Sequence, residues 1–455
     1  MSIVSGKTDL TEGPVARHVV RMSVPMLWGI LSMISVQLVD TFYIGLLGTA
    51  PLAAIGFTFP VTMTVLSLII GLGIAMSSVL SRKSGAKQHD DIVPITSHGI
   101  LLALGAGTLM GATGLVVMKP LFTAMGAEGP VLTLVLDYMQ IWFAGCIVMA
   151  LPLVGNSAMR ALGDTITPAF IMMGLSLLNA VLAALLVFGL LGFPRMGMQG
   201  AALATVLSFA AAACASLCVL YFKKKMIFQG SLHMERFGSS VRALLHVALP
   251  VGAASIIQPV AQGIITVILA AHGAAAVAAF GVATRVEAMA FVIIIALATG
   301  MSPIIGQNWG AARRDRVRET LRLAMLFAVL WSLAIAVLLA LFARPVAAAF
   351  STNPDVIHNT ILYFLIVPFS YAPWTLLQGW SSAFNAIGES KKALVMIVVR
   401  SLVLQVPLAL FFGRLFGVTG VFWAIAVTNV VTGLFFHFRH WPDLAYDPPE
   451  MRSAA

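Results

Sequence analysis

Long apolar runs separated by short polar segments dominate this sequence of 455 residues. Most runs reach the roughly 20 residues that an α-helix needs to cross the hydrocarbon core of a bilayer. They show little alternation of apolar and polar positions, which favours helices over the strands of a membrane barrel. We therefore predict an all-α integral membrane protein with twelve transmembrane helices, over residues 17–45, 51–79, 93–118, 131–155, 165–190, 198–222, 243–271, 276–305, 319–343, 355–386, 391–414 and 418–438.

Composition agrees with this pattern. Hydrophobic residues make up 60% of the chain and charged residues only 10%, whereas an ordinary soluble protein carries about 25% charged residues. A soluble globular protein is therefore excluded.

Basic residues are concentrated in alternate loops. Lys and Arg favour the cytoplasmic side of a membrane protein, and most of the 27 lie in the amino-terminal arm, in every second loop after it and near the carboxyl end. Both termini are therefore predicted to be cytoplasmic, in a multi-pass protein of the bacterial inner membrane. Contact with anionic lipid headgroups accounts for the net charge of +10, so we expect membrane lipids and no nucleic acid as partners.

The chain contains an internal repeat. Pro25 pairs with Pro250, Gln37 with Gln262, and the motif "MRALGDT" with "FNAIGES", in each case 225 positions apart. A repeat of six spans preserves orientation, so the halves are predicted to be parallel repeats around a central cleft. We predict an amino-terminal lobe with the start of a cytoplasmic linker over residues 1–230, a carboxy-terminal lobe over 231–440, and a cytoplasmic tail over 441–455.

Asp40 is the most unusual residue of the first span. A charge at bilayer depth costs about 2.5–3.5 kcal/mol on insertion scales and commonly marks a functional site. The repeat partner of Asp40 is Ile265, although its neighbours Gln37 and Thr41 are retained in the second copy. The six-helix scaffold therefore does not require the acid, which favours a functional role over a structural one.

The paired motifs "VDTFYIGLLGTAPLAAIGF", "GIAMSSVLSRKSGA" with "GMSPIIGQNWGA", and "AMRALGDT" with "AFNAIGES" closely resemble the MATE (multidrug and toxic compound extrusion) family. The branch typified by the DNA-damage-inducible protein F is the nearest. The resemblance covers about residues 15–440. It implies two six-helix lobes around a cleft and export of amphipathic organic cations, driven by inward H⁺ or Na⁺.

The resemblance also implies roles for individual residues. Asp40 matches the coupling acid of the first helix, and the polar residues Tyr138, Asn156 and Asn179 match those that line the amino-terminal cavity. Many relatives carry a second acid one turn after Asn179, where this chain has Ala183. Asp40 is therefore expected to carry more of the coupling.

Asp40 can serve an antiporter because apolar surroundings favour a neutral carboxyl group, whereas a bound cation favours the carboxylate. Proton and cationic cargo then compete for one group. The alternative is a structural acid held by backbone donors or by Asn179. We favour proton coupling over sodium, because a hard cation needs several oxygen ligands and the sequence supplies only Asp40, Asn179, Thr41 and carbonyls.

Three further residues are candidates for function. Pro25 lies inside an apolar span and is predicted to kink the helix, either as a hinge or as a static bend. Glu287 and Arg285 form a possible site in the second lobe, although a structural ion pair across helices explains them equally well. Two positions apart on a helix, they point to nearly opposite sides and cannot pair directly.

No catalytic motif is present: the sequence has neither a Gly-rich phosphate loop with Lys nor an HExxH helix. We therefore expect a monomeric transporter, and not an enzyme, with no cofactor and no metal site. A rival is a flippase for lipid-linked saccharides from the same superfamily. Such a protein would need several bases in its cleft, whereas the clear intramembrane bases here are Arg285 and Arg400.

Overall fold

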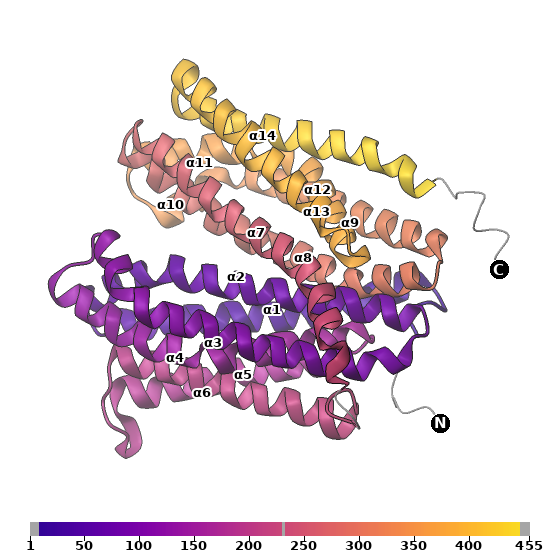
Figure 1. Cartoon of the computed structure of the whole chain (residues 1–455). Helices are drawn as coiled ribbons and strands as arrows, with labels where there is room; N and C mark the ends of the chain where they lie inside the picture. The colour runs from indigo at the N-terminus through magenta and orange to yellow at the C-terminus, as the bar shows by residue number, and fades with distance from the viewer. Residues whose placement is uncertain (1–8, 230–232, 446–455) are drawn as a thin grey trace. The chain divides into compact units, whose positions relative to one another are not determined.

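Helices make up nearly all the regular structure of the protein (Figure 1). The computed structural model describes residues 9–229 and 233–445, and no β-strand occurs in these ranges. The helices of the first half are α1 (Val15–Gly45), α2 (Thr49–Gly85), α3 (Ile92–Ala124), α4 (Gly129–Ala161), α5 (Ile166–Phe188) and α6 (Met198–Cys218), with the short segments η1 (His89–Asp91), η2 (Leu190–Gly192) and η3 (Val219–Lys223).

The helices of the second half follow in the same order. They are α7 (Phe237–Ala270), α8 (Ala274–Gly310), α9 (Arg314–Leu341), α10 (Ala343–Phe350), α11 (Pro354–Ile366), α12 (Tyr371–Ile387), α13 (Ser390–Val398) and α14 (Val406–Ala445), with the short segments η4 (Met234–Arg236), η5 (Pro368–Ser370) and η6 (Val399–Gln405). The segments η3 and η6 are π-helical.

Eleven helices in the described residues are long and apolar enough to cross a membrane. The last of them, Ser390–Pro442, covers both the eleventh and the twelfth predicted span. It is interrupted at Gly417, where φ is 62° and ψ is −143°, a conformation that essentially only glycine adopts. The break separates the two predicted spans, and the predicted all-α membrane fold is confirmed.

The internal repeat is visible in the helix boundaries. Helices α2 and α8 begin and end at positions 225 residues apart. The break at Gly417 has its counterpart at Gly197, which also has a positive φ of 54° at the start of α6. At these positions the two halves of the sequence share their helix boundaries.

The chain forms two compact units. Of the described residues, the first unit contains 9–10 and 24–252, and the second contains 11–23 and 253–445. In the first unit α4 packs against α2, α3 and α6, and in the second α12 packs against α8, α9 and α14 (Figure 1). The predicted boundary near residue 230 and most of the predicted tail lie outside the described residues.

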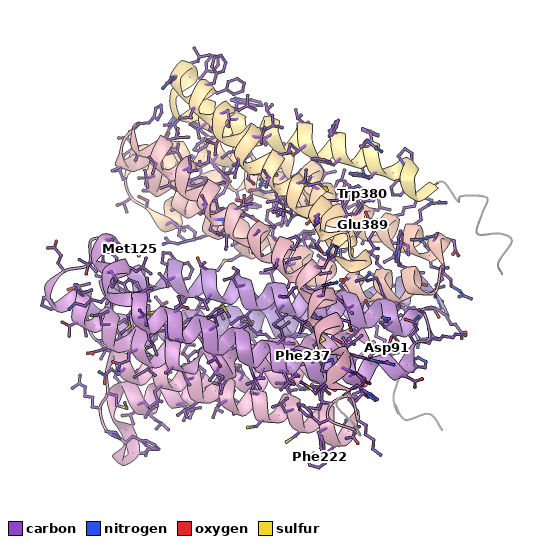
Figure 2. All side chains as sticks on the ribbon, in the orientation of Figure 1. Asp91, Met125, Phe222, Phe237, Trp380 and Glu389 are labelled. Atoms are coloured by element: carbon purple, nitrogen blue, oxygen red, sulfur yellow. The ribbon has the colours of Figure 1, made fainter. Side chains whose placement is uncertain are left out.

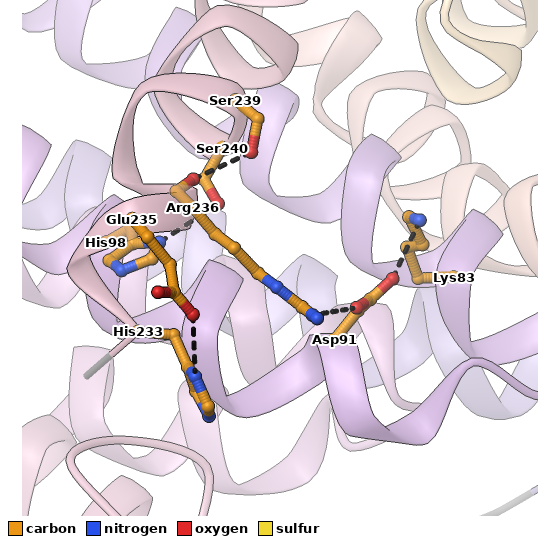
Figure 3. Close-up of polar contacts among 8 residues, drawn as sticks. All are labelled: Lys83, Asp91, His98, His233, Glu235, Arg236, Ser239 and Ser240. Carbon is orange, nitrogen blue, oxygen red and sulfur yellow. Dashed lines mark hydrogen bonds and ion pairs between the residues drawn. The ribbon is translucent and has the colours of Figure 1, made fainter. Parts of the chain in front are cut away.

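The start of α7 is attached to the first unit by polar contacts (Figure 3). Arg236 lies 3.4 Å from Asp91, which also pairs with Lys83 at 2.8 Å. The Nδ1 of His98 lies 2.9 Å from the hydroxyl of Ser240, and Figure 2 shows Asp91 and Phe237 at the same end of this unit. These contacts explain why residues up to 252 belong to the first unit although α7 continues into the second.

Candidate functional site

The first unit contains a cavity formed by α1, α2, α4, α5 and α6. Its wall is mostly apolar, and Asp40 is the only charged residue in it. The lining residues are Met33, Val36, Gln37, Asp40, Thr41, Ile55, Thr58, Phe59, Thr62, Met63, Leu66, Tyr138, Trp142, Met149, Leu175, Thr205 and Phe209.

Asp40 is held by a chain of side-chain hydrogen bonds. The hydroxyl of Thr205 donates to Oδ2 of Asp40 at 3.0 Å, and Nδ2 of Asn179 donates to the oxygen of Thr205 at 3.2 Å. Asp40 is only 7% exposed, and its other oxygen, Oδ1, has no hydrogen-bond partner among the described residues. One carboxylate oxygen is therefore stabilised, while the other is buried and open to a proton or a cation.

Thr205 was not identified from the sequence. It lies on α6, 165 positions from Asp40, in the stretch "AALATVLSF", where it is one of two polar side chains. A lone threonine in an apolar span is usually explained by a bond to its own helix, and Thr205 also lies 3.1 Å from the carbonyl of Ala201. The sequence therefore gave no signal that it would reach Asp40.

Of the other residues predicted for this site, some line the cavity and others do not. Gln37, Thr41 and Tyr138 line the cavity. Asn179 is fully buried and does not line the cavity, and its Nδ2 donates to Thr205. Asn156 is also buried and does not line the cavity, and neither of its amide atoms has a hydrogen-bond partner among the described residues.

Pro25 lies inside α1, next to the position where this helix passes from the second unit to the first. Its repeat partner Pro250 lies inside α7, two residues before the corresponding change of unit at Gly252. Proline removes one intrahelical hydrogen bond and weakens a helix at that point. Both long helices therefore have a proline where they leave one compact unit for the other.

The second unit also contains a cavity. Glu287, Tyr363, Arg400 and Asn429 line it, together with Gln258, Ala261, Gln262, Phe280, Thr284, Ala288, Phe291, Ile295, Trp374, Ser401, Gln405 and Ile425. Arg285 is exposed and does not line this cavity, because it points to a different side of α8 from Glu287. The structure thus brings Glu287 together with Arg400 instead of Arg285.

Comparisons with known proteins agree with the fold and the repeat. A family model named MatE matches residues 25–185 and again residues 250–411. The chain is 35% identical over 425 residues to a FAD transporter of Shewanella oneidensis, covering 93% of this chain and 94% of the relative. It is 23% identical over 428 residues to the multidrug export protein MepA of Staphylococcus haemolyticus, covering 92% of each.

A solved structure is also similar. The Vibrio cholerae MATE transporter VcmN in its bent form superposes with a TM-score of 0.89 at 29% identity, covering 95% of this chain and 97% of that one. None of these similarities distinguishes the predicted branch of the family, which stays a prediction.

Proposed function

The chain belongs to the MatE family of transporters, and on this premise we propose that it exports amphipathic organic cations in exchange for protons, with Asp40 binding either one. The family assignment makes it a multi-pass membrane transporter and not an enzyme. The proposal adds the coupling ion, the class of cargo and the group that couples them. A monomer in the bacterial inner membrane with both termini in the cytoplasm is part of the same proposal.

The observation that carries the proposal is the single charged group in the first cavity. Asp40 is the only charged residue among those lining it, and aromatic and methionine side chains form much of the remaining wall. Such a wall suits flat apolar cations, since aromatic faces attract positive charge and methionine adapts to different shapes. A cation bound at Asp40 would displace a proton from the same carboxyl group.

Sodium is the alternative coupling ion. The side-chain oxygens that a hydrogen bond brings together at this site are the two carboxylate oxygens of Asp40 and the hydroxyl of Thr205. Three side-chain oxygens are a small set for a hard cation, whereas a proton needs only the open Oδ1. This difference favours the proton.

The alternative cargoes are FAD, because the Shewanella relative is named for it, and a lipid-linked saccharide. Both carry phosphates, which an isolated carboxylate in the first cavity would repel. The first cavity therefore favours a cation.

Transport into proteoliposomes tests the proposal, with ethidium as the cargo and with pH and sodium gradients imposed separately. We expect a pH gradient alone to drive transport, and we expect Asp40→Asn to abolish it. Asp90→Asn is the matched control, because Asp90 is exposed and lies outside the cavity. Transport driven only by sodium would reject proton coupling, and full activity of Asp40→Asn would reject the role of Asp40.

A further inference from the structure

The two cavities occupy equivalent places in the two repeats. Tyr138 of the first cavity and Tyr363 of the second are 225 positions apart, as are Gln37 and Gln262. Most other lining residues correspond in the same way, with a spacing of 220 near the end of each repeat. The second cavity is therefore the counterpart of the proposed transport site and not an unrelated gap between helices.

The charges of the second cavity differ from those of the first. Ile265, which is fully buried, replaces Asp40. Arg400 stands where the first cavity has Leu175, and Glu287 stands where it has Thr62. The second cavity therefore lacks a carboxylate at the position of Asp40, but it has a guanidinium at the position of Leu175 and a carboxylate at the position of Thr62.

Arg400 is held in place by hydrogen bonds, but these do not use all of its N–H donors. Its Nε and one terminal nitrogen donate to Oδ1 of Asn429 at 3.1 and 2.8 Å, and the other terminal nitrogen lies 3.4 Å from the hydroxyl of Ser401. Asn429 is fixed in turn by a bond to Ser370 at 2.9 Å. A guanidinium has five N–H donors, and these contacts use three. Two donors remain for a ligand.

Glu287 does not neutralise Arg400 by direct contact. Its carboxylate accepts a hydrogen bond from Tyr363 at 3.0 Å, and no ion pair within 4.0 Å joins it to Arg400 in the described part of the chain. A purely structural pair in an apolar setting would be expected to close up, because separated buried charges are costly. The separation leaves space between an acid and a guanidinium.

Four aromatic side chains, Phe280, Phe291, Tyr363 and Trp374, form part of the wall. The rings of Phe291 and Trp374 have centroids 4.5 Å apart, and Phe280 lies across from Tyr363 at 6.1 Å. Arg400, Ser401 and Gln405 belong to the π-helical segment η6, a distortion that is frequent at functional sites. The cavity thus combines flat apolar surfaces with uncommitted donors from a fixed guanidinium.

We propose that the second cavity is a separate ligand site for a flat aromatic anion, whose phosphate or carboxylate is bound by Arg400 while its ring lies against Phe291 and Trp374. This inference goes beyond the proposed function, because it gives the second repeat a class of ligand that the first cavity would repel.

Binding of two matched fluorescent probes tests the site in the purified full-length protein, without a gradient. Riboflavin and flavin mononucleotide share one ring system and differ by a phosphate. We expect the phosphorylated probe to bind more tightly, and Arg400→Gln to weaken it roughly 10- to 100-fold while leaving riboflavin within about twofold. Arg414→Gln, at an exposed position of α14, is the matched control and should change neither.

Two further measurements keep the test decisive if Arg400→Gln does not fold. Arg400→Lys keeps the charge but not the forked geometry, so it should lose part of the preference for the phosphorylated probe. Inorganic phosphate should displace flavin mononucleotide from the unmodified protein more readily than riboflavin. Equal affinity for the two probes, or a preference that survives in folded Arg400 variants, would overturn the proposal.

The same titrations in Asp40→Asn separate this inference from the proposed function. Retained binding of flavin mononucleotide in that variant supports a second site independent of the coupling acid. Loss of this binding in Asp40→Asn, with unchanged binding in Arg400→Gln, would place the anion elsewhere and reject the inference while leaving cation export at Asp40 intact.

Discussion

The hydroxyl of Thr205 lies 3.0 Å from Oδ2 of Asp40 and 3.1 Å from the carbonyl oxygen of Ala201. A threonine hydroxyl has one proton, so it can donate to only one of these oxygens at a time. The carboxylate is the stronger acceptor when it is ionised. Protonation of Asp40 would release the hydroxyl of Thr205 to the carbonyl of Ala201 on α6. The charge of Asp40 on α1 is thereby coupled to the hydrogen bonding of α6.

Removal of this hydroxyl should weaken cation binding. Thr205→Val keeps the shape of the side chain but removes a hydrogen bond to a charged group, worth about 1.5–3 kcal/mol. We expect the affinity for ethidium to fall by about tenfold or more, measured by fluorescence titration of the purified protein. Thr205→Ser should retain most of the affinity, and equal affinities for the valine and serine variants would contradict the role of the bond.

Cation binding should release protons. If ethidium and a proton compete for Asp40, adding ethidium to weakly buffered protein will acidify the solution, and a pH indicator dye will record the change. Asp40→Asn should release none, whereas Asp90→Asn should behave as the unmodified protein. Proton release that persists in Asp40→Asn would assign the competition to another group.

Pro25 should matter more for transport than for stability. Pro25→Ala restores a backbone donor in α1 next to the change of unit, so we expect an unchanged or higher melting temperature but several-fold slower ethidium export. Pro60→Ala is the comparison, because Pro60 lies inside α2, well within the first unit. Normal export by Pro25→Ala would favour a static kink.

The turns at Asp164 and Glu389 should differ in their contributions to stability. Asp164 pairs with Lys224 at 2.6 Å, and their side chains are only 16% and 13% exposed. Glu389 pairs with Lys392, and these side chains are 42% and 54% exposed. Exposed pairs contribute about 0–1 kcal/mol, but a shielded charged hydrogen bond contributes about 1.5–3 kcal/mol. Asp164→Asn should therefore lower the melting temperature clearly more than Glu389→Gln.

The stabilisation of the fold by Asp164 should depend on pH in one direction. Burial of Asp164 opposes its ionisation, but bonds from Lys224 and Thr167 outweigh burial and hold the pKa of Asp164 below its ordinary value. Its stabilising effect is therefore complete above the unfolded pKa of about 3.9 and is lost as the pH falls through the lower folded pKa. The difference in melting temperature between the unmodified protein and Asp164→Asn should shrink over that acidic range, and a constant difference would contradict the pairing.

Gly417 should tolerate no side chain. Its φ and ψ lie where other residues incur a cost of about 1–3 kcal/mol, so Gly417→Ala should lower the melting temperature. Gly105 lies inside α3 with nothing within 4 Å of an added Cβ, and alanine there should be neutral or stabilising. Equal effects of the two changes would argue against the break at Gly417.

The amino-acid sequence by itself determined the helices, the repeat and the exceptional position of Asp40. This was possible because every backbone polar group in a bilayer must be satisfied within its own helix, so the apolar length of each run fixes its structure locally. The turns at Gly163 and Gly388, which both have positive φ, follow from the same local chemistry.

Only the tertiary structure decided which side chains meet. Asp40 and Thr205 are 165 positions apart, and Arg400 reaches Asn429 from a π-helical segment that no apolar pattern indicates. The tertiary structure also showed that Glu287 lines the second cavity and Arg285 does not, and that Asn156 does not line the first cavity. Such contacts depend on how each helix is rotated about its axis and packed against its neighbours, and in a chain apolar on nearly every face, hydrophobicity does not specify that rotation.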